Sequence, residues 1–412
     1  MFHYSNNRLF CDGVPLADIA AQVGSPTYIY SAELIRKNTN SYLLADSTAT
    51  FAYALKANQN LAILKLLCTT GIGADVTSGG ELFLALEAGF DPKKIIFSGV
   101  GKRDDEIRMA LKADISAIHV ESTAELYVIE SIAAEMGKVA RVGFRLNPNV
   151  SADTHPYIST GLLENKFGVP MAEGMALIQH AAASVHLHPT GIAFHIGSQI
   201  KETASFVEAA HIITDLAIEL RSAGIELDYI DIGGGLGIDY AQGISDTNLQ
   251  LGKTIQAWVK ETGAPIKSAG FGLKAEPGRS IIGGAGCLLT QVTFTKNNGE
   301  KQFAIVDSGM NDLIRPTLYQ ADHPILPLNE ANSGEAQMID VVGPICESGD
   351  FMAKNRVLPR VQRGDLLAIM NAGAYGFAMS SNYNGRLKPA EVLVEGAKWE
   401  IIRPRQQLKE LL

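Results

Sequence analysis

Lys56 is the residue whose surroundings most suggest covalent chemistry. It lies in the segment YALKAN (residues 53–58), whose apolar neighbours predict a largely buried ammonium. A buried lysine is costly unless it is paired or its pKa is depressed, and a depressed pKa favours Schiff-base formation with a carbonyl compound. A lysine at a strand end that reaches solvent is the commoner case. The interpretation of Lys56 therefore depends on the residues around it.

Two glycine-containing segments later in the chain could bind a phosphate group. The segment GGGLG (233–237) exposes backbone N–H groups with no Cβ to block an anion. The segment EPGR (276–279) adds the guanidinium of Arg279. If Glu276 faced a pyridine nitrogen, its charge would keep that nitrogen protonated and make the ring an electron sink. The alternative is that both segments are ordinary turns and that Glu276 lies on the surface.

His195 and Ser198 form a third candidate group, in the segment FHIGSQ (194–199). The imidazole of His195 could stack on a flat ring, although a lone histidine on an apolar strand is more often a core residue. Ser198 could donate to a phosphate, although loop serines usually bond their own backbone.

Further candidates lie in the last third of the chain. The segment PICESGD (344–350) places Cys346 beside Glu347, between turn-forming residues. Arg315 and Tyr319, four residues apart, could bind a carboxylate, which arginine contacts bidentately. Tyr375 has small neighbours that would let a ligand approach its ring and hydroxyl. Each could equally be an ordinary packing or surface residue.

A repeating rhythm between residues 50 and 276 would position these groups. Short apolar runs alternate with helical patterns such as 80–87, 104–112 and 123–136. Eight strands alternating with helices predict an α/β fold, a TIM-like (β/α)8 barrel, rather than a Rossmann sheet, which would use fewer strands and an early glycine-rich turn. The predicted strands are 51–55, 73–76, 95–98, 117–120, 142–146, 191–195, 229–232 and 272–275.

After residue 280 the pattern changes to short strands with few long helices between them. Strands are predicted at 287–295 and 303–307, joined by a turn at 297–299, and at 341–342, 366–370, 391–394 and 400–402. We therefore predict a barrel domain at 25–275 and a second, mostly β domain formed by 276–412 with 1–24; the assignment of 1–24 to this domain is what the family resemblance given below implies. The polar loop 147–170, with its segment HPY (155–157), is long enough to be functional or disordered.

Composition excludes several classes of protein. A net charge of −9 over 412 residues argues against a nucleic-acid surface, because phosphate backbones need clustered lysine and arginine. We see no secretory signal and no apolar stretch of the ~20 residues that span a bilayer. The four cysteines lie far apart without C-x-x-C spacing. These features predict a cytoplasmic protein with reduced thiols and no metal site.

Taken together, these segments resemble the fold-type III decarboxylases that depend on pyridoxal 5′-phosphate (PLP), with an alanine racemase-like architecture. Within that family they most resemble the branch that acts on meso-2,6-diaminopimelate. The resemblance runs from about residue 25 to the C-terminus, and its motifs occur in the same order along the chain. They are 53–58, 155–161 with 164–168, 195–199, 233–235, 276–280, 346–350 and 372–384.

The resemblance implies roles for the candidates. Lys56 would carry PLP as a Schiff base, His195 would stack on the ring, and Glu276 would bond the ring nitrogen. Lys56, His195 and Cys346 would be catalytic, with Cys346 donating a proton across a homodimer interface. The remaining cofactor-binding residues would be Ser198, Gly234, Gly235, Pro277, Gly278, Arg279 and Tyr375, and the substrate-binding residues would be Arg279, Arg315, Tyr319, Glu347 and Tyr375.

The implied reaction converts meso-2,6-diaminopimelate into L-lysine and carbon dioxide, the last step of lysine biosynthesis. A plain diamine precursor would leave Arg279 and Arg315 unpaired and partly desolvated, so it should be rejected. Three alternatives stay open. They are a decarboxylase of ornithine, arginine or lysine, a racemase, which would be expected to place a cation near the ring nitrogen, and a non-catalytic relative that only binds PLP.

Overall fold

The computed structural model describes residues 1–412 except 151–165, 242, 245–246 and 331–334, and it leaves out the side chains of 247–249. The chain forms two compact units. One comprises Thr39–Gly237 and Leu251–Arg279, and the other comprises Met1–Asn38, Ile238–Gln250 and Ser280–Leu412. We call them the barrel unit and the β unit. The predicted loop residues 155–157, and the motif residues 155–161 and 164–165, lie outside the described part.

The barrel unit contains a closed ring of eight parallel strands among its described residues, as predicted. The ring closes because β8 pairs with β9, and β13 pairs with β5. A short strand, β10 (Val169–Pro170), pairs parallel with the end of β9. The eight strands are β5 (Thr50–Ala54), β6 (Gly73–Val76), β7 (Ile95–Phe97), β8 (Ala117–Val120), β9 (Ala140–Asn147), β11 (Leu187–Ala193), β12 (Tyr229–Asp231) and β13 (Gly272–Ala275).

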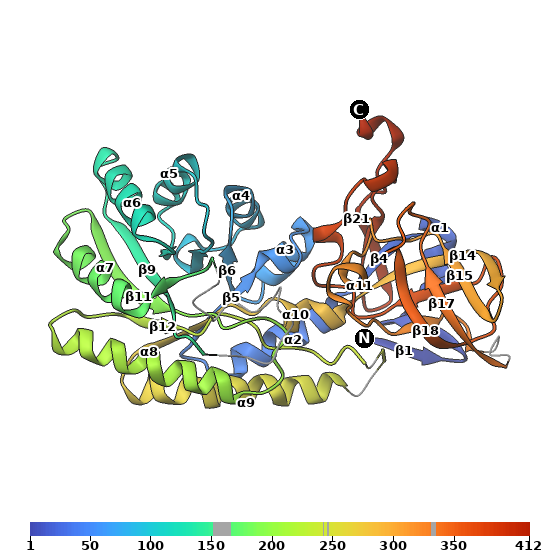
Figure 1. The fold of residues 1–412 in the computed structure, drawn as a ribbon, viewed down its shortest axis with the longest axis horizontal. Coiled ribbons are helices and arrows are strands. Elements are labelled where there is room, and N and C mark those ends of the chain that lie inside the picture. The colour runs from blue at the N-terminus through green and yellow to red at the C-terminus, as the bar shows by residue number, and fades with distance from the viewer. Residues whose placement is uncertain (151–165, 242, 245–246, 331–334) are drawn as a thin grey trace. The chain divides into compact units, whose positions relative to one another are not determined.

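Helices lie outside this ring of strands (Figure 1). Their ends follow local signals. Ser78 and Ser122 cap α4 and α6 by accepting the backbone N–H groups of Glu81 and Glu125, and α4 ends at Gly89 with a positive φ of 92°. The helices are α3 (Leu61–Cys68), α4 (Gly79–Ala88), α5 (Asp104–Ala113), α6 (Thr123–Glu135), α7 (Met171–Ala183) and α8 (Ala204–Ser222). Two others, α2 (Ala32–Ala45) and α9 (Thr247–Ser268), run across the boundary between the units along the chain.

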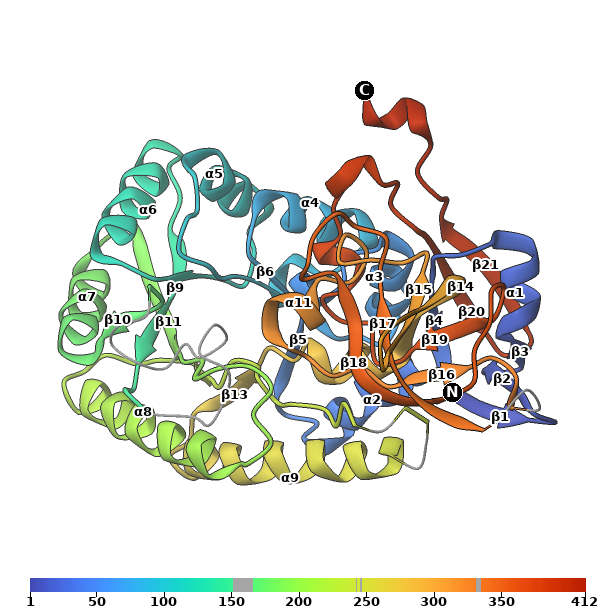
Figure 2. The same cartoon turned by 45° about the vertical axis from the view of Figure 1, so that its right-hand side comes forward.

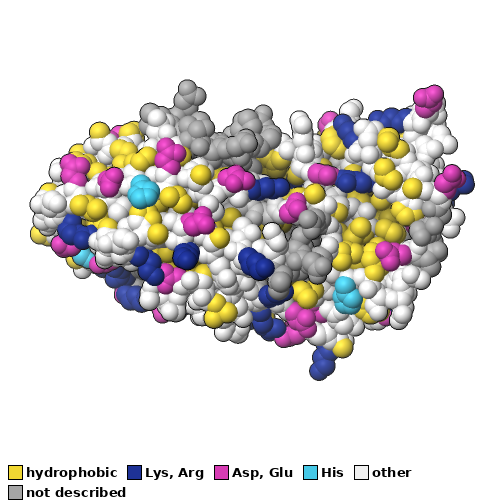
Figure 3. All heavy atoms as spheres, turned by 90° about the horizontal axis from the view of Figure 1, so that it is seen from below, with side chains coloured by type: hydrophobic (Ala, Val, Ile, Leu, Met, Phe, Trp, Pro, Cys, Tyr) yellow, Lys and Arg dark blue, Asp and Glu magenta, His cyan; other side chains and the backbone are white. Residues whose placement is uncertain are grey.

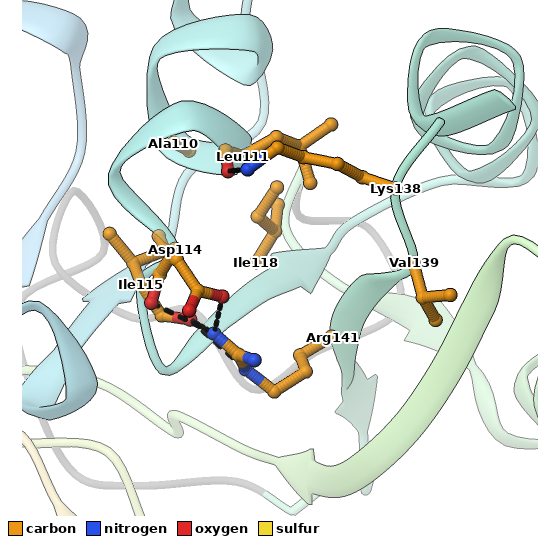
Figure 4. Close-up of a pocket in the computed structure, with 8 residues that line it drawn as sticks. All are labelled: Ala110, Leu111, Asp114, Ile115, Ile118, Lys138, Val139 and Arg141. Carbon is orange, nitrogen blue, oxygen red and sulfur yellow. Dashed lines mark hydrogen bonds and ion pairs between the residues drawn. The ribbon is translucent and has the colours of Figure 1, made fainter. Parts of the chain in front are cut away.

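Arg141 ties the end of α5 to β9 beside a cavity of about 250 Å³ (Figure 4). Its Nε donates to the carbonyls of Ile115 and Ser116, both at 3.1 Å, and its Nη2 donates to the carbonyl of Asp114 at 2.8 Å. Across the cavity, Lys138 donates to the carbonyl of Leu111 at 2.8 Å. The charged groups of this cavity therefore stabilise the fold through bonds to the protein's own backbone.

Replacing Arg141 with methionine should lower the free energy of unfolding by about 2 kcal/mol, because several charge-assisted hydrogen bonds are lost while the aliphatic stem remains. Lys138→Met is the matched control. It removes one hydrogen bond to a carbonyl, and the expected loss is about 1 kcal/mol. Urea denaturation of the three proteins measures both effects. Equal losses in the two variants would contradict this role for Arg141.

The β unit contains a larger and a smaller sheet. The smaller is β1 (Phe2–Ser5), β2 (Arg8–Cys11) and β3 (Val14–Pro15), with α1 (Leu16–Val23) beside it (Figure 2). The larger runs in the order β18, β17, β15, β14, β4, β20, β21; in addition β19 pairs with β14, and β16 pairs with β19. Its strands are β4 (Thr27–Ser31), β14 (Gly286–Asn298), β15 (Lys301–Val306), β16 (Ile325–Pro327), β17 (Ala336–Val342), β18 (Phe351–Pro359), β19 (Leu366–Ile369), β20 (Ala390–Glu395) and β21 (Lys398–Arg403). The prediction of a mostly β region is confirmed.

The compact units differ from the predicted boundaries at β4. We predicted that the barrel domain begins at residue 25, whereas β4 belongs to the β unit. It pairs antiparallel with β14 and parallel with β20, and all five of its residues are buried, so its hydrogen bonds and its packing lie within that sheet. The segment Ile238–Gln250 also belongs to the β unit.

Over the described residues, no helix combines the length and apolar character needed to cross a bilayer. On the face in Figure 3, lysine and arginine side chains alternate with aspartate and glutamate side chains.

Candidate active site

The polar groups predicted at strand ends do gather at one end of the barrel. In a (β/α)8 barrel the carboxyl ends of all strands meet at the same face, where chemistry is found. Lys56 lies in a 3-10 turn, Leu55–Ala57, directly after β5, and His195 follows β11. The other groups at this end are Asp75 in β6, Ser98 after β7, Glu121 after β8, Arg145 in β9, Gly233–Gly235 after β12 and Glu276 after β13.

Lys56 is held by a buried carboxylate. Its Nζ donates to Asp75 Oδ2 at 2.9 Å, and the exposed fractions of the two side chains are 43% and 0%. The prediction of a largely buried ammonium is therefore wrong, because the 3-10 turn carries Lys56 beyond the strand end to the open mouth of the barrel. Asp75 Oδ1 is buried without a hydrogen-bond partner among the described residues. The ion pair with Asp75 therefore holds the Lys56 amine at the carboxyl end of the barrel strands.

The backbone of the glycine loop, Gly233–Gly235, packs closely against the backbone of the neighbouring loops. Gly233 and Gly235 have φ values of 64° and 106°, which favour glycine. A Cβ on Gly234 would lie 2.4 Å from the carbonyl oxygen of Glu276, and one on Gly235 would lie 2.2 Å from that of Gly197. Larger residues would therefore push the three loops apart. Next to them, Arg279 Nη2 donates to Ser198 Oγ at 3.0 Å.

His195 is a neutral ring beside this loop. Its Nδ1 accepts the backbone N–H of Gly234 at 3.2 Å, so the proton of the neutral ring lies on Nε2. Burial lowers the pKa of His195 well below its usual value, and the positive charges of Arg145 and Lys56 lower it further. The imidazole is therefore uncharged at neutral pH, which suits stacking on a flat ring.

Glu276 is surrounded by other acids. Its side chain is only 10% exposed. Burial raises the pKa of Glu276 well above its usual value, and the charges of Asp231 and Asp75 raise it further, while Lys56 and Arg145 oppose the rise. Ser98 Oγ donates to Glu276 Oε1 at 3.3 Å. This carboxyl group is poised to exchange a proton with a basic group that binds next to it.

Glu121 and Arg145 support the site, although the sequence assigned them no role. Glu121 accepts Arg145 Nη1 at 3.0 Å and the backbone N–H groups of Gly99 at 3.1 Å and Gly168 at 2.8 Å. The guanidinium carbon of Arg145 lies 4.7 Å from the ring centre of Phe167. One carboxylate thus joins three loops. The signal was present, because both residues lie at or just after the ends of predicted strands, but a strand-end position alone gives no role.

The remaining candidates lie in the β unit. Arg315 begins α11 (Arg315–Tyr319) and is buried; its Nη1 donates to His323 Nε2 at 2.8 Å. Asp350 accepts the backbone N–H groups of Met310 at 2.6 Å and Ile345 at 2.7 Å. That bonding builds the turn on which Cys346 lies.

Cys346 and Glu347 are neighbours on this turn, and both are exposed. The Cys346 thiol is free, and its backbone N–H donates to Asn384 Oδ1 at 2.8 Å. Tyr375 has a φ of 56°, a left-handed conformation that costs of order 1–3 kcal/mol in a residue other than glycine. Such strain is common at functional sites.

The barrel residues fit a phosphorylated aldehyde cofactor. Glu276, Asp75 and Asp231 form a cluster of acids. One oxygen of Asp75 and one of Asp231 are buried without hydrogen-bond partners among the described residues. Beside this cluster lie an amine, a neutral imidazole and the glycine loop with Arg279. The set supplies an amine for a carbonyl, a carboxyl for a ring nitrogen, and N–H and guanidinium donors for a phosphate.

Comparison with known proteins agrees with this chemistry. Residues 32–283 match the family model of the pyridoxal binding domain of pyridoxal-dependent decarboxylases. The chain belongs to this family, and its barrel with a mostly β second unit is the fold-type III architecture.

The individual relatives are more specific. The chain is 44% identical to the diaminopimelate decarboxylase of Aquifex aeolicus over 404 residues, covering 98% of this chain and 94% of that one. It is also 44% identical to that of Pseudomonas aeruginosa, covering 100% and 97%. Among solved structures, the diaminopimelate decarboxylase of Helicobacter pylori complexed with L-lysine matches with a TM-score of 0.90 and 41% identity, covering 96% of this chain and 98% of that chain.

Proposed function

We infer that this chain is a carboxy-lyase that converts meso-2,6-diaminopimelate into L-lysine and carbon dioxide with PLP, the last step of lysine biosynthesis. The observation that carries the inference is the Lys56–Asp75 pair at the barrel end that also holds Glu276 and the glycine loop. Full-length relatives named diaminopimelate decarboxylase, one of them solved with L-lysine, support the choice of substrate.

We propose the following roles in the barrel. When bound, the cofactor supplies an electron sink for the pair left by the departing carbon dioxide. When PLP is bound, Lys56 Nζ would hold it as an imine at the aldehyde carbon, formed with loss of water, His195 would lie against its ring, and Glu276 would face its ring nitrogen. Its phosphate would be held by Ser198, Gly234, Gly235 and the segment Pro277, Gly278 and Arg279, and Tyr375 would also contact the cofactor.

Binding of the far end of the substrate needs both signs of charge. Arg279, Arg315 and Tyr319 bind the distal carboxylate, and Glu347 binds the distal ammonium, with Tyr375 beside the substrate. Cys346 donates the proton that replaces carbon dioxide. Because Cys346 lies on an exposed turn, we propose that a homodimer supplies it to the partner's site, and we place the enzyme in the cytoplasm.

Product identification tests the reaction. Purified protein with PLP, incubated separately with meso-2,6-diaminopimelate, ornithine, lysine and arginine, should give lysine from the first alone. A site built to pair a polar group rejects an analogue lacking it by roughly 10⁴-fold in kcat/KM. Mass spectrometry of the products and trapping of carbon dioxide provide the measurement.

Three outcomes would contradict the proposal. Turnover of ornithine or arginine without turnover of diaminopimelate would identify another basic amino-acid decarboxylase. Inversion of a chiral centre without carbon dioxide release would identify a racemase. A cofactor absorbance band that shifts with substrate, without any product, would identify a non-catalytic relative.

A further inference from the structure

Behind Glu276 lies a buried histidine that the proposed roles do not use. His119, in β8, is 1% exposed, and its Nδ1 lies 3.7 Å from Glu276 Oε1. A Cβ added to Gly143 would lie 2.5 Å from His119 Cδ2, so the neighbouring strand fits closely against the ring. The imidazole is therefore held in one place, facing the carboxyl group.

Tyr229 determines which nitrogen of His119 carries the proton. Its hydroxyl lies 3.1 Å from His119 Nε2. Burial raises the pKa of Tyr229 above its usual value, so the hydroxyl keeps its proton. Thr190 Oγ1 lies 3.5 Å away and donates to the carbonyl of Val142 at 3.1 Å. His119 Nε2 is the nearest acceptor for the Tyr229 hydroxyl, and we infer that Tyr229 donates to it, which leaves the proton of the neutral ring on Nδ1, facing Glu276.

The charges around His119 keep it neutral. Burial lowers the pKa of His119 well below its usual value, and Lys274, Lys102 and Arg145 lower it further. A neutral ring with its proton on Nδ1 offers Glu276 an N–H group without adding a charge. Burial and the charges of Asp231 and Asp75 disfavour a charged Glu276, and the cations Lys56 and Arg145 favour it. The Ser98 hydroxyl lies 3.3 Å and His119 Nδ1 lies 3.7 Å from Glu276 Oε1.

We propose that His119 is a positioning residue whose Nδ1–H, fixed by the Tyr229 hydroxyl, orients the Glu276 carboxyl and supports its negative charge when it faces the ring nitrogen of the cofactor. The inference rests on the proposed function for the role of Glu276. It adds a buried Tyr229–His119–Glu276 chain that controls the protonation of the cofactor ring from inside the barrel.

A divalent metal ion is the competing occupant of this cluster. Donor atoms of His119, Asp231 and Glu276 lie within 4.8 Å of one another. The three cations that act on His119 oppose a dication there, and Asp231 Oδ1 already accepts the backbone N–H of Gly233 at 2.9 Å. The geometry therefore favours a row of neighbouring polar groups, with His119 Nδ1 3.7 Å from Glu276 Oε1, over a metal centre.

The test uses holoenzyme without substrate and follows the cofactor's absorbance against pH. His119→Leu should raise the pH midpoint of the cofactor band, because the band reports protonation of the imine between Lys56 and the cofactor, and the pKa of that imine rises when the ring nitrogen loses its proton. The same variant should lower kcat roughly tenfold with KM unchanged, as loss of a supporting partner does. His119→Asn keeps an N–H donor and should restore most of both effects. Tyr229→Phe removes only the hydroxyl that fixes the tautomer and should shift the midpoint in the same direction by less.

The matched control is His180→Leu. His180 in α7 forms a similar pair, with its Nε2 2.8 Å from Glu130 Oε2, but it contacts none of the proposed site residues in the described structure. It should leave the band and kcat unchanged. Tm and bound PLP, measured for every variant, identify a fold defect. If His119→Leu fails to fold, Tyr229→Phe and His119→Asn still test whether the Tyr229–His119 contact affects Glu276.

The overturning results are distinct from failure of the proposed function. A band midpoint in His119→Leu equal to wild type, or an equal defect in His119→Asn, would show that His119 only packs. Stoichiometric Co²⁺ binding by cofactor-free wild type that is lost in His119→Asn would show a metal site. Absence of carbon dioxide release by wild type would remove the reaction, while the substrate-free titration would still report on His119.

Discussion

Lys56→Ala is expected to lower the rate of carbon dioxide release by roughly 10³-fold or more. The variant loses both the covalent attachment point and an amine able to move a proton beside the reacting carbon, and a positioned acid–base group alone contributes about 10²–10⁴-fold. Single-turnover release of carbon dioxide from meso-2,6-diaminopimelate, at saturating PLP, measures the loss.

Lys56→Arg separates attachment from electrostatics. Arginine keeps a cation near the buried Asp75 carboxylate, whereas the alanine variant leaves that carboxylate without its ion-pair partner. Because a guanidinium stays charged and does not add to an aldehyde, Lys56→Arg should be as inactive as Lys56→Ala but closer to wild type in Tm. An arginine variant with more than a tenth of wild-type activity would show that Lys56 acts only through its charge.

Glu276→Gln is expected to have the second largest effect, a fall in kcat of roughly 10²–10³-fold, the range for removal of one preorganised electrostatic partner. Glutamine matches the shape of glutamate but is neutral, so it cannot keep a ring nitrogen protonated. The same change removes one of three neighbouring acids and should not weaken the fold. Steady-state kinetics with bound PLP and Tm measured in parallel would check it.

Glu276→Asp serves as the control, because it keeps the charge and moves it back by one methylene. It should retain more activity than Glu276→Gln. If glutamine and wild type had equal kcat, the ring nitrogen would not depend on this carboxyl group, and the proposed role of Glu276 would be wrong.

The barrel was predictable because parallel strands are buried on both faces and appear as short apolar runs. The predicted strands at 73–76, 117–120 and 272–275 coincide with β6, β8 and β13. Glycines and carboxylates at the ends of these strands also gave the main site residues, since the fold brings all strand ends together. In the barrel, the local sequence pattern and the overall topology therefore give the same strands.

Other features depend on partners far along the chain. β4 has five buried residues, yet nothing in its sequence shows that β14 and β20 flank it, so its place in the β unit was missed. Apolar neighbours made Lys56 look buried, whereas a single 3-10 turn carries it to the barrel mouth. His119 gave no signal, because its importance comes from Glu276 and Tyr229, which belong to other β/α repeats of the barrel.

Reduction of PLP-loaded protein with borohydride tests the central claim most directly. Borohydride makes a link between an amine and the aldehyde cofactor permanent, and peptide mapping then finds the modified residue. Pyridoxyl on the peptide carrying Lys56, with no modification in Lys56→Arg, is the expected result. Modification of another lysine, or none in protein that has bound PLP, would contradict the account.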